Sequence, residues 1–370
     1  MISAAVSAAN HARCGLAFVH THPGDSKAPQ LSSIDQETTV RLGVAFDDLI
    51  DGPFASLVVS PGGWGGTVYE HRTIKPVDRL ATVGRRLHLF DRQLSPERSE
   101  LDDRQQSLLG HAGNHLLRSL RVAIVGVGGT GSPVAETLTR MGVGELILVD
   151  PDRLESSNAR RVFGVTRTDA LAGTPKVSAV ADGLRRLDLG TTLTAIDGDV
   201  RDGTIQATLL SCDVVIGATD NHASRASLTE LAARSHLLLI DIGVRAGTRR
   251  NGELDALYAE RRLQIPDGPC LWCWRVLDAD RVRLELMSSF EREALQAEGY
   301  VAGQPDGPEP TIAALTVTAA GLATTTLLGL VGGGLDTSPL RAGLEALNVQ
   351  AIGYSDERDP ECVCKRWRPA

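Results

Sequence analysis

A glycine-rich turn between two apolar runs, within Arg121 to Asp150, constrains the fold of this chain more than any other stretch. The first apolar run, Val122 to Val125, stops at a cluster of glycines, after which apolar residues recur at helical spacing. A second apolar run, Leu146 to Val149, ends in Asp150. This order predicts a βαβ unit with a nucleotide-binding turn. The glycines of the turn are Gly126, Gly128, Gly129 and Gly131.

The chemistry of this turn favours a phosphate ligand. Glycines leave the backbone N–H groups at the positive end of the following helix open to a phosphate. A carboxylate about twenty residues further on, here Asp150, can accept hydrogen bonds from ribose hydroxyls. Because many chemistries use this fingerprint, a nicotinamide- or flavin-binding Rossmann domain is an alternative to be decided by downstream residues.

Composition narrows the class of protein. A chain of 370 residues has room for two domains or more, and a content of 4% aromatic residues suits a fold of helices on a parallel sheet. The net charge of −8 argues against nucleic-acid or anionic-membrane partners. The uncharged stretch Thr311 to Leu335 raises the question of a membrane span, but its threonines and glycines favour a soluble helix. Residues 1–19 do not resemble a signal peptide.

The amino-terminal residues 1–78 are expected to form a partial α/β domain. The pattern predicts an alanine-rich helix, a strand at Gly15–His20, a helix from Asp35 and a strand at Phe54–Ser60. His20 and His22 alternate along an extended segment and so point to one face, and Ser32-x-x-Asp35 follows. Two imidazoles and a carboxylate suit a catalytic zinc ion that keeps its fourth position open.

This segment resembles the JAMM/MPN isopeptidase motif, His-[Ser/Thr]-His-Pro followed by Ser-x-x-Asp. The resemblance implies that His20, His22 and Asp35 bind zinc and that Ser32 helps to hold the oxyanion. The general base of that family is a glutamate upstream of the histidines, and residues 1–19 contain neither Glu nor Asp. We therefore expect either a truncated start or a module that has lost hydrolysis and packs or recognises a partner.

Residues 79–120 are interpreted as a linker followed by the amino-terminal helix of a second domain, with the helix at Leu101 to Leu120. The second domain, residues 121–370, carries polar residues where a nucleotide's phosphates are expected: Asn158, Arg161 and Lys176. A further apolar strand, Cys212 to Ala218, is followed by Asp220. A carboxylate at that sheet edge, opposite a lysine and an arginine, fits magnesium and a triphosphate better than a hydride donor.

Five ordered motifs resemble the ThiF/MoeB-type adenylyltransferases, the superfamily of ubiquitin-activating enzymes, over about Leu89 to Lys365. The motifs are GVGGTGS, VDPD, SNARR, Lys176-Val and ATDN. The resemblance implies a Rossmann-like doubly wound sheet in which Asp150 holds the ribose, three polar side chains hold the phosphates and Asp220 binds Mg²⁺. Those three side chains are Asn158, Arg161 and Lys176. The family's SNLxRQ reads SNARRV here, so the contacts of its leucine and glutamine are left open.

Arg92, in the DRQ segment, matches an arginine that in this family reaches into the partner subunit's site, which implies a homodimer. Four of the six cysteines form two close pairs, Cys270-x-x-Cys273 and Cys362-x-Cys364. Four thiolates predict a closed structural zinc site in a reducing compartment such as the cytoplasm. The second pair has one intervening residue where two are usual, and buried thiols without metal are the alternative.

The resemblance implies ATP-dependent adenylation of the carboxyl-terminal glycine of a ubiquitin-like or sulfur-carrier protein. Thioester-forming relatives carry a cysteine in the stretch that corresponds to Trp274–Pro310, which has none here, so direct transfer to an external acceptor is expected. Three alternatives remain: a nicotinamide-dependent oxidoreductase, a non-catalytic tail-binding partner and a peptide-adenylating relative.

Overall fold

The computed structural model describes residues 2–12, 15–24, 29–61, 63–83, 87–91, 101, 103–248, 254–298, 311–333, 338–343, 348–351 and 357–367. They belong to two compact units, the first mainly within residues 1–82 and the second mainly within residues 96–365. The stretch between them, residues 83–95, is divided between the two units, and residues 366–370 belong to the first.

The first unit combines two helices with a four-stranded sheet of order β1-β2-β3-β4, in which β1 and β2 are parallel and the other pairs antiparallel. The helices and strands expected in residues 1–78 are present, but β3 and β4 were not predicted. A separate two-stranded sheet, β5-β6, lies in the stretch expected to be linker. The elements are α1 (Ile2–Ala12), β1 (Leu16–Thr21), α2 (Ser33–Asp47), β2 (Phe54–Ser60), β3 (Gly63–Glu70), β4 (Thr73–Pro76), β5 (Arg79–Val83) and β6 (Leu87–Asp91).

The second unit is built on an eight-stranded sheet of order β14-β13-β12-β11-β10-β7-β8-β9. The five strands from β11 to β9 in this order run parallel, and β12, β13 and β14 extend the sheet with antiparallel pairs. The strands are β7 (Arg121–Val125), β8 (Glu145–Val149), β9 (Thr192–Ile196), β10 (Val214–Gly217), β11 (Leu238–Thr248), β12 (Leu254–Gln264), β13 (Leu340–Gly343) and β14 (Asn348–Ala351). The central βαβ prediction is confirmed as β7, α4 and β8.

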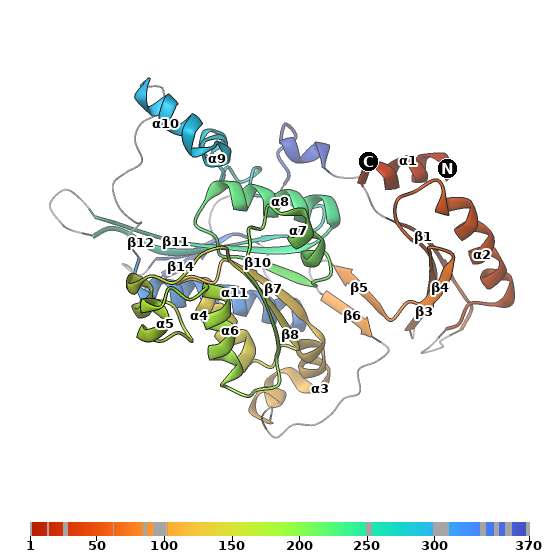
Figure 1. Cartoon of the computed structure of the whole chain (residues 1–370). Helices are drawn as coiled ribbons and strands as arrows, with labels where there is room; N and C mark the ends of the chain where they lie inside the picture. The colour runs from red at the N-terminus through yellow and green to blue at the C-terminus, as the bar shows by residue number, and fades with distance from the viewer. Residues whose placement is uncertain are drawn as a thin grey trace. The chain divides into compact units, whose positions relative to one another are not determined.

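Helices cover both faces of this sheet, with α7 and α8 on one face and α4, α6 and α11 on the other (Figure 1). Alternate residues of β7, Ala123 and Val125, pack into the core beneath α7 and α8, as expected for a buried parallel strand. The helices are α3 (Asp103–Ser119), α4 (Gly131–Arg140), α5 (Arg167–Leu171), α6 (Lys176–Arg185), α7 (Gly203–Leu209), α8 (His222–Ser235), α9 (Ala279–Leu286), α10 (Ser289–Ala297) and α11 (Ala313–Gly332), with the 3₁₀ turns η2 (Ser156–Arg160) and η3 (Val363–Arg366). The expected helix before β7 is α3, which is interrupted at Gly110.

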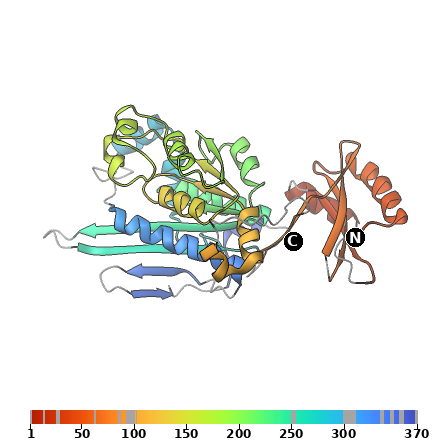
Figure 2. The same cartoon turned by 90° about the horizontal axis from the view of Figure 1, so that it is seen from below.

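Helix α11 occupies most of the uncharged stretch Thr311 to Leu335. By length and composition alone it is apolar enough to cross a membrane, and half of its most apolar window is buried inside the structure. It lies along β11 and β12 (Figure 2) and also contacts α3 and α4. These contacts place α11 against the sheet of the second unit.

The strand order creates a switch point between β7 and β10. The chain leaves β7 toward β8 on one side, whereas β10 connects to β11 on the other. In open α/β sheets ligands bind at the carboxyl ends of strands at such a point. The glycine turn follows β7 there, and Thr219 and Asp220 follow β10.

Candidate functional site

The glycine turn packs so closely that two of its glycines are required by the fold. Gly126 has φ of 87°, and a Cβ at this position would lie 2.7 Å from the carbonyl oxygen of Ala218. A Cβ on Gly131 would lie 1.8 Å from the oxygen of Gly126, so α4 can approach β7 only with glycine here. A Cβ on Gly128 would meet nothing within 4 Å. The space beside Gly128 is therefore open on the side where a phosphate is expected.

Asp150 lies at the end of β8 and ties the turn to the sheet. Its buried carboxylate accepts hydrogen bonds from the N–H of Val127 at 2.8 Å and of Asp152 at 2.9 Å. Lys176, at the start of α6, places its Nζ 4.0 Å from Asp150 and 2.6 Å from Asp152. Burial raises the pKa of Asp150, and the Lys176 ammonium acts in the opposite direction. The structure thus brings a buried carboxylate and a half-buried cation to one edge of the turn.

Arg161, the last residue of the SNARR motif, lies against the glycine turn. A Cβ on Gly129 would lie 3.3 Å from Cδ of Arg161, so the arginine side chain runs directly beside the turn. Ser132 fixes this arrangement, because its hydroxyl donates to the oxygen of Gly128 and accepts from the N–H of Phe163. Ser132 ends the GVGGTGS motif, but this positioning role was not predicted from the motif.

Asn158 precedes Arg161 by three residues, and its side chain forms a local hydrogen bond. It is buried, and its side-chain oxygen accepts from the N–H of Glu155 to cap η2. Its predicted phosphate contact would have to be made by the side-chain nitrogen, which is 3.5 Å from the hydroxyl of Ser157.

Asp220 completes the edge of the site from β10. It is exposed and forms no hydrogen bond or ion pair with another described residue, so its carboxylate is available to a cation such as Mg²⁺. The preceding hydroxyl, Oγ1 of Thr219, is buried and also has no hydrogen-bond partner among the described residues. Because Ala218 packs on Gly126, this segment lies next to the glycine turn.

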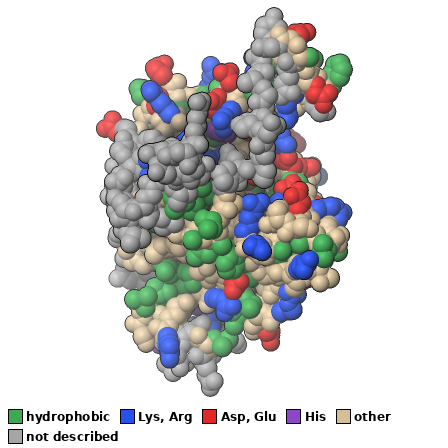
Figure 3. Space-filling model, turned by 90° about the vertical axis from the view of Figure 1, so that its left-hand side faces the viewer, with side chains coloured by type: hydrophobic (Ala, Val, Ile, Leu, Met, Phe, Trp, Pro, Cys, Tyr) green, Lys and Arg blue, Asp and Glu red, His purple; other side chains and the backbone are tan. Residues whose placement is uncertain are grey.

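Basic side chains extend beyond the turn. Arg153, Arg160 and Arg167, on or near η2 and α5, are exposed. Lys and Arg side chains lie across the middle of the face drawn in Figure 3, interspersed with apolar and acidic side chains. Exposed basic side chains can attract an anionic ligand.

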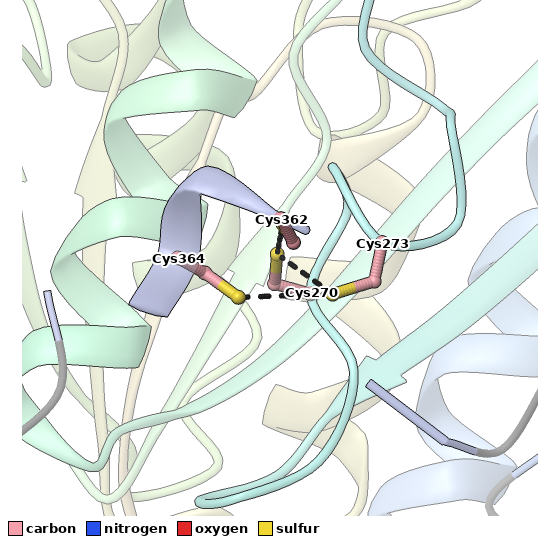
Figure 4. Close-up of side chains that lie close together, drawn as sticks. All are labelled: Cys270, Cys273, Cys362 and Cys364. Atoms are coloured by element: carbon pink, nitrogen blue, oxygen red, sulfur yellow. Dashed lines mark hydrogen bonds between the residues drawn. The ribbon is translucent and has the colours of Figure 1, made fainter. Parts of the chain in front are cut away.

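The four predicted zinc ligands converge within the second unit (Figure 4). Cys270 and Cys273 come from the segment after β12, and Cys362 and Cys364 from the carboxyl-terminal end. Neighbouring sulfur atoms lie 3.6 Å (Cys270–Cys273), 3.7 Å (Cys270–Cys362) and 3.7 Å (Cys273–Cys364) apart. Zinc–sulfur bonds of about 2.3 Å in a tetrahedron require sulfur atoms roughly 3.8 Å apart. The single-residue spacing of the second pair therefore does not prevent four thiols from meeting.

The electrostatics of these thiols also suit a cation. The hydrogen bond from Cys270 lowers the pKa of Cys273 to about 4, whereas burial raises the pKa of Cys362 to about 12. Three of the four thiols are buried and Cys273 is half-buried. A divalent cation would stabilise the thiolate form of every ligand in this setting.

The predicted amino-terminal ligands converge as well. Nε2 of His20 and Nε2 of His22 lie 3.2 Å apart, and the Asp35 carboxylate lies 3.2 Å and 3.1 Å from them. The Asp35 carboxylate accepts from the N–H of Ser32, and Oγ of Ser32 accepts from the N–H of Asp35, which together form the capping box of α2. The Ser32 hydroxyl also donates to the Asp35 carboxylate, and this side-chain bond is the main cause that lowers the pKa of Asp35 to about 2. In this structure Ser32 therefore orients the carboxylate rather than facing an open position.

Arg92 lies outside the described residues, so its predicted role stays a prediction. A buried ion-pair network that joins β11, β12 and α8 was not anticipated: Asp241 pairs with Arg225 at 3.0 Å and Arg262 at 3.3 Å, and Glu260 pairs with Arg262.

Comparison with known proteins gives matching results over the second unit. A sequence model of the ThiF family matches residues 102–362. The SAMP-activating enzyme E1 of Haloferax volcanii is 30% identical over 184 residues, which are 49% of this chain and 64% of that protein. The molybdopterin-synthase adenylyltransferase of Escherichia coli is 35% identical over 116 residues, 31% of this chain and 46% of that protein. The matches thus span less than two thirds of each of these relatives.

Solved structures support the same fold. Escherichia coli MccB with MccA-N7isoASN superposes with a TM-score of 0.55 at 18% identity, covering 72% of this chain and 75% of that one. MccB with ATP gives a TM-score of 0.51 at 18% identity and 68% coverage of both chains. The mixed sheet and its helices therefore share the MccB fold.

Proposed function

The chain belongs to the ThiF family, and from that premise we propose that it is an adenylyltransferase that activates the carboxyl-terminal glycine of a ubiquitin-like or sulfur-carrier protein. The observation that carries the proposal is that Arg161 lies against the glycine turn and Lys176 beside Asp150, whose carboxylate bonds the turn, while Asp220 follows the neighbouring strand β10. A dehydrogenase has no use for this set of charges. The names of the SAMP-activating and molybdopterin-synthase relatives support the substrate class.

The reaction joins the tail's carboxylate to the α-phosphorus of ATP and expels pyrophosphate, which leaves an acyl-adenylate. Carboxylate and triphosphate repel each other, so the site must neutralise charge and hold the two reactants in line. Arg161 and Lys176 supply two cations at the turn, and Asp150 accepts hydrogen bonds from the ribose. Mg²⁺, held by Asp220, supplies further charge neutralisation when bound.

The acyl-adenylate passes to an external acceptor. No cysteine occurs between Trp274 and Pro310, so no internal thioester forms in that stretch. We propose that Arg92 of a second copy of the chain completes the nucleotide site, so that the active form is a homodimer.

Each of the two ligand clusters is suited to hold one zinc ion. The four cysteines hold a structural ion, because four thiolates leave no coordination position open. His20, His22 and Asp35 hold an ion with an open fourth position, as in JAMM/MPN domains. A JAMM/MPN-like first unit that handles ubiquitin-like tails is a consistent companion for a second unit that activates them.

ATP–pyrophosphate exchange tests the adenylation. The assay compares the full chain with Lys176→Ala, with Mg²⁺ and with or without a purified ubiquitin-like protein that ends in Gly-Gly. We expect exchange that requires the protein and that falls by at least about tenfold in the variant, because one charge at the phosphates is lost. Exchange supported only by a short peptide would assign the chain to the peptide-adenylating branch. Measurable ATP binding without exchange for any tail would identify a non-catalytic tail-binding protein instead.

A further inference from the structure

Arg225, in the first turn of α8, is attached to β11 by its guanidinium group. Its Nε lies 3.0 Å from Oδ1 of the buried Asp241, and its Nη2 donates to the carbonyl oxygen of Ile242 at 3.2 Å. A Cβ on Gly243 would lie 2.7 Å from Nη2 of Arg225, so the guanidinium lies directly on this glycine. The start of α8 and the strand β11 are therefore joined by a close polar contact.

Asp220 lies on the short segment between β10 and α8. Before it, the N–H of Ala218 donates to the carbonyl oxygen of Val125 at 2.8 Å and so continues the ladder between β10 and β7. After it, α8 begins two residues later, and the N–H of Arg225 donates to the carbonyl oxygen of Asn221 at 3.4 Å. The direction in which Asp220 leaves the sheet thus depends on how the first turn of α8 is held.

The first turn of α8 is held differently from the rest of the helix. The α8 residues that join Ala123 and Val125 of β7 in the hydrophobic core are Leu228, Leu231 and Ala232, which lie in later turns. The backbone of the first turn is bonded to α9, a helix that contributes no buried side chain. The contact of Arg225 with β11 is therefore an important support of this turn.

Asp241 is well placed to fix the arginine relative to the nucleotide site. It ends the stretch of β11 that pairs in parallel with β10, where it lies opposite Gly217. Its other carboxylate oxygen pairs with Arg262 of β12 at 3.3 Å. Buried ion pairs often add little net stability, because both charges lose their water, but they can hold elements in one geometry. Asp241 thus holds Arg225 at a set position beside the end of β10.

We propose that Arg225 is a positioning residue that holds the carboxylate of Asp220 where it can bind the Mg²⁺ of the nucleotide site. It acts through Asn221 and the first turn of α8, and it touches neither the nucleotide nor the ion. This inference rests on the proposed function, since it assigns a support to the metal ligand of that site. A residue that only stabilised the fold would change the melting temperature without a specific effect on Mg²⁺.

The test is binding of a non-hydrolysable ATP analogue to the full chain, measured by calorimetry with Mg²⁺ and without it. The ratio of the two affinities reports the contribution of the cation. Arg225→Lys keeps the charge, but lysine lacks the planar fork that contacts both Asp241 and the Ile242 carbonyl. We expect the affinity ratio to fall by about tenfold and the affinity without Mg²⁺ to stay as in the wild type. An unchanged ratio, or an equal loss of affinity with and without Mg²⁺, would overturn the inference.

Arg262→Lys is the matched control. Arg262 is buried and pairs with the same carboxylate of Asp241, but it comes from β12 and not from α8. Both lysine variants should lower the melting temperature, whereas only Arg225→Lys should lower the affinity ratio. An equal fall of the ratio in both variants would mean that the ion-pair network supports the fold as a whole, and would contradict the proposal.

Gly243→Ala disturbs the same contact without changing a charge, and it serves if Arg225→Lys does not fold. Its Cβ would lie 2.7 Å from Nη2 of Arg225, so the guanidinium must move, whereas the strand backbone of β11 accepts alanine. We expect the affinity ratio to fall in the same direction as in Arg225→Lys. A Gly243→Ala protein with the wild-type ratio would count against the proposal.

Asp220→Ala shows whether Arg225 acts through Asp220. This variant should itself lower the affinity ratio, and adding Arg225→Lys should lower it no further, because the ligand that Arg225 positions is gone. A further loss in the double variant, or an unchanged ratio in Asp220→Ala, would overturn the inference. Failure of the proposed adenylation appears elsewhere, as absent pyrophosphate exchange by the wild type, while the binding measurements still report on Arg225.

Discussion

Asp150 has a structural role and a proposed binding role, and substitution can separate the two. Its buried carboxylate satisfies the N–H groups of Val127 and Asp152. Asp150→Ala leaves the Val127 N–H buried without an acceptor, which should lower the free energy of unfolding by about 1–3 kcal/mol. Asp150→Asn keeps one acceptor oxygen and relieves the buried charge, so its stability should change less. Both variants should bind ATP more weakly. Urea unfolding and ATP titration measure the two effects.

Asp152 is the control for this prediction. It pairs with Lys176 at 2.6 Å, but its own side chain is 63% exposed, and such pairs contribute little. Asp152→Asn should unfold within about 0.5 kcal/mol of the wild type. If Asp152→Asn lost as much stability as Asp150→Ala, the loss in both variants would come from removing a negative charge near Lys176. It would then not come from the unpaired N–H of Val127.

Substitutions at two glycines of the turn should have different effects, one on folding and the other on ATP binding. Gly131→Ala places a Cβ 1.8 Å from the backbone oxygen of Gly126, so α4 must move away from β7. We expect a loss of about 1–3 kcal/mol in the free energy of unfolding. Gly128→Ala meets nothing within 4 Å and should fold normally, but its methyl group stands where a phosphate approaches. Its ATP affinity should fall while its unfolding midpoint does not. An unaffected ATP affinity would place the phosphates elsewhere.

At the level of elements, the sequence predicted those parts whose residues carry a local signal. The apolar runs and glycines gave β7, α4 and β8, and the histidine and cysteine spacings gave ligand sets that do converge. The long strands β11 and β12 were missed because their charged residues look like solvent-exposed positions. Only the fold reveals that Asp241 and Arg262 are buried as an ion pair. Likewise, β3 contains three glycines, which weaken any strand pattern.

In the candidate site too, residues whose place follows from motif order could be predicted, whereas local side-chain contacts could not. Asp150 and Lys176 could be placed because motif order fixes which strand and helix they follow. The side chain of Asn158, by contrast, is engaged in a local cap, which spacing alone does not reveal.

For the whole molecule, the metal content is the most direct prediction. Two groups of ligands should give two zinc ions per chain in elemental analysis of protein purified under reducing conditions. His20→Ala with His22→Ala should remove one ion, as should Cys364→Ser, if each cluster binds independently. A wild-type chain with no zinc at either cluster would contradict both assignments.

The two losses should differ in their effect on folding. The cysteine cluster joins the segment after β12 to the carboxyl-terminal end, so it closes a loop of about 90 residues in the second unit. Losing its ion frees that end and leaves four closely spaced thiols, three of them buried, without the bonds that joined the two segments. This loss should lower the free energy of unfolding of the second unit by about 4 kcal/mol. Cys364→Ser or a zinc chelator should therefore lower its melting temperature. The double histidine variant is the matched control, because it removes an ion from the first unit and leaves the cysteine cluster intact. Equal melting temperatures for Cys364→Ser and wild type, with one ion lost, would show that the cysteine-bound ion does not stabilise the fold.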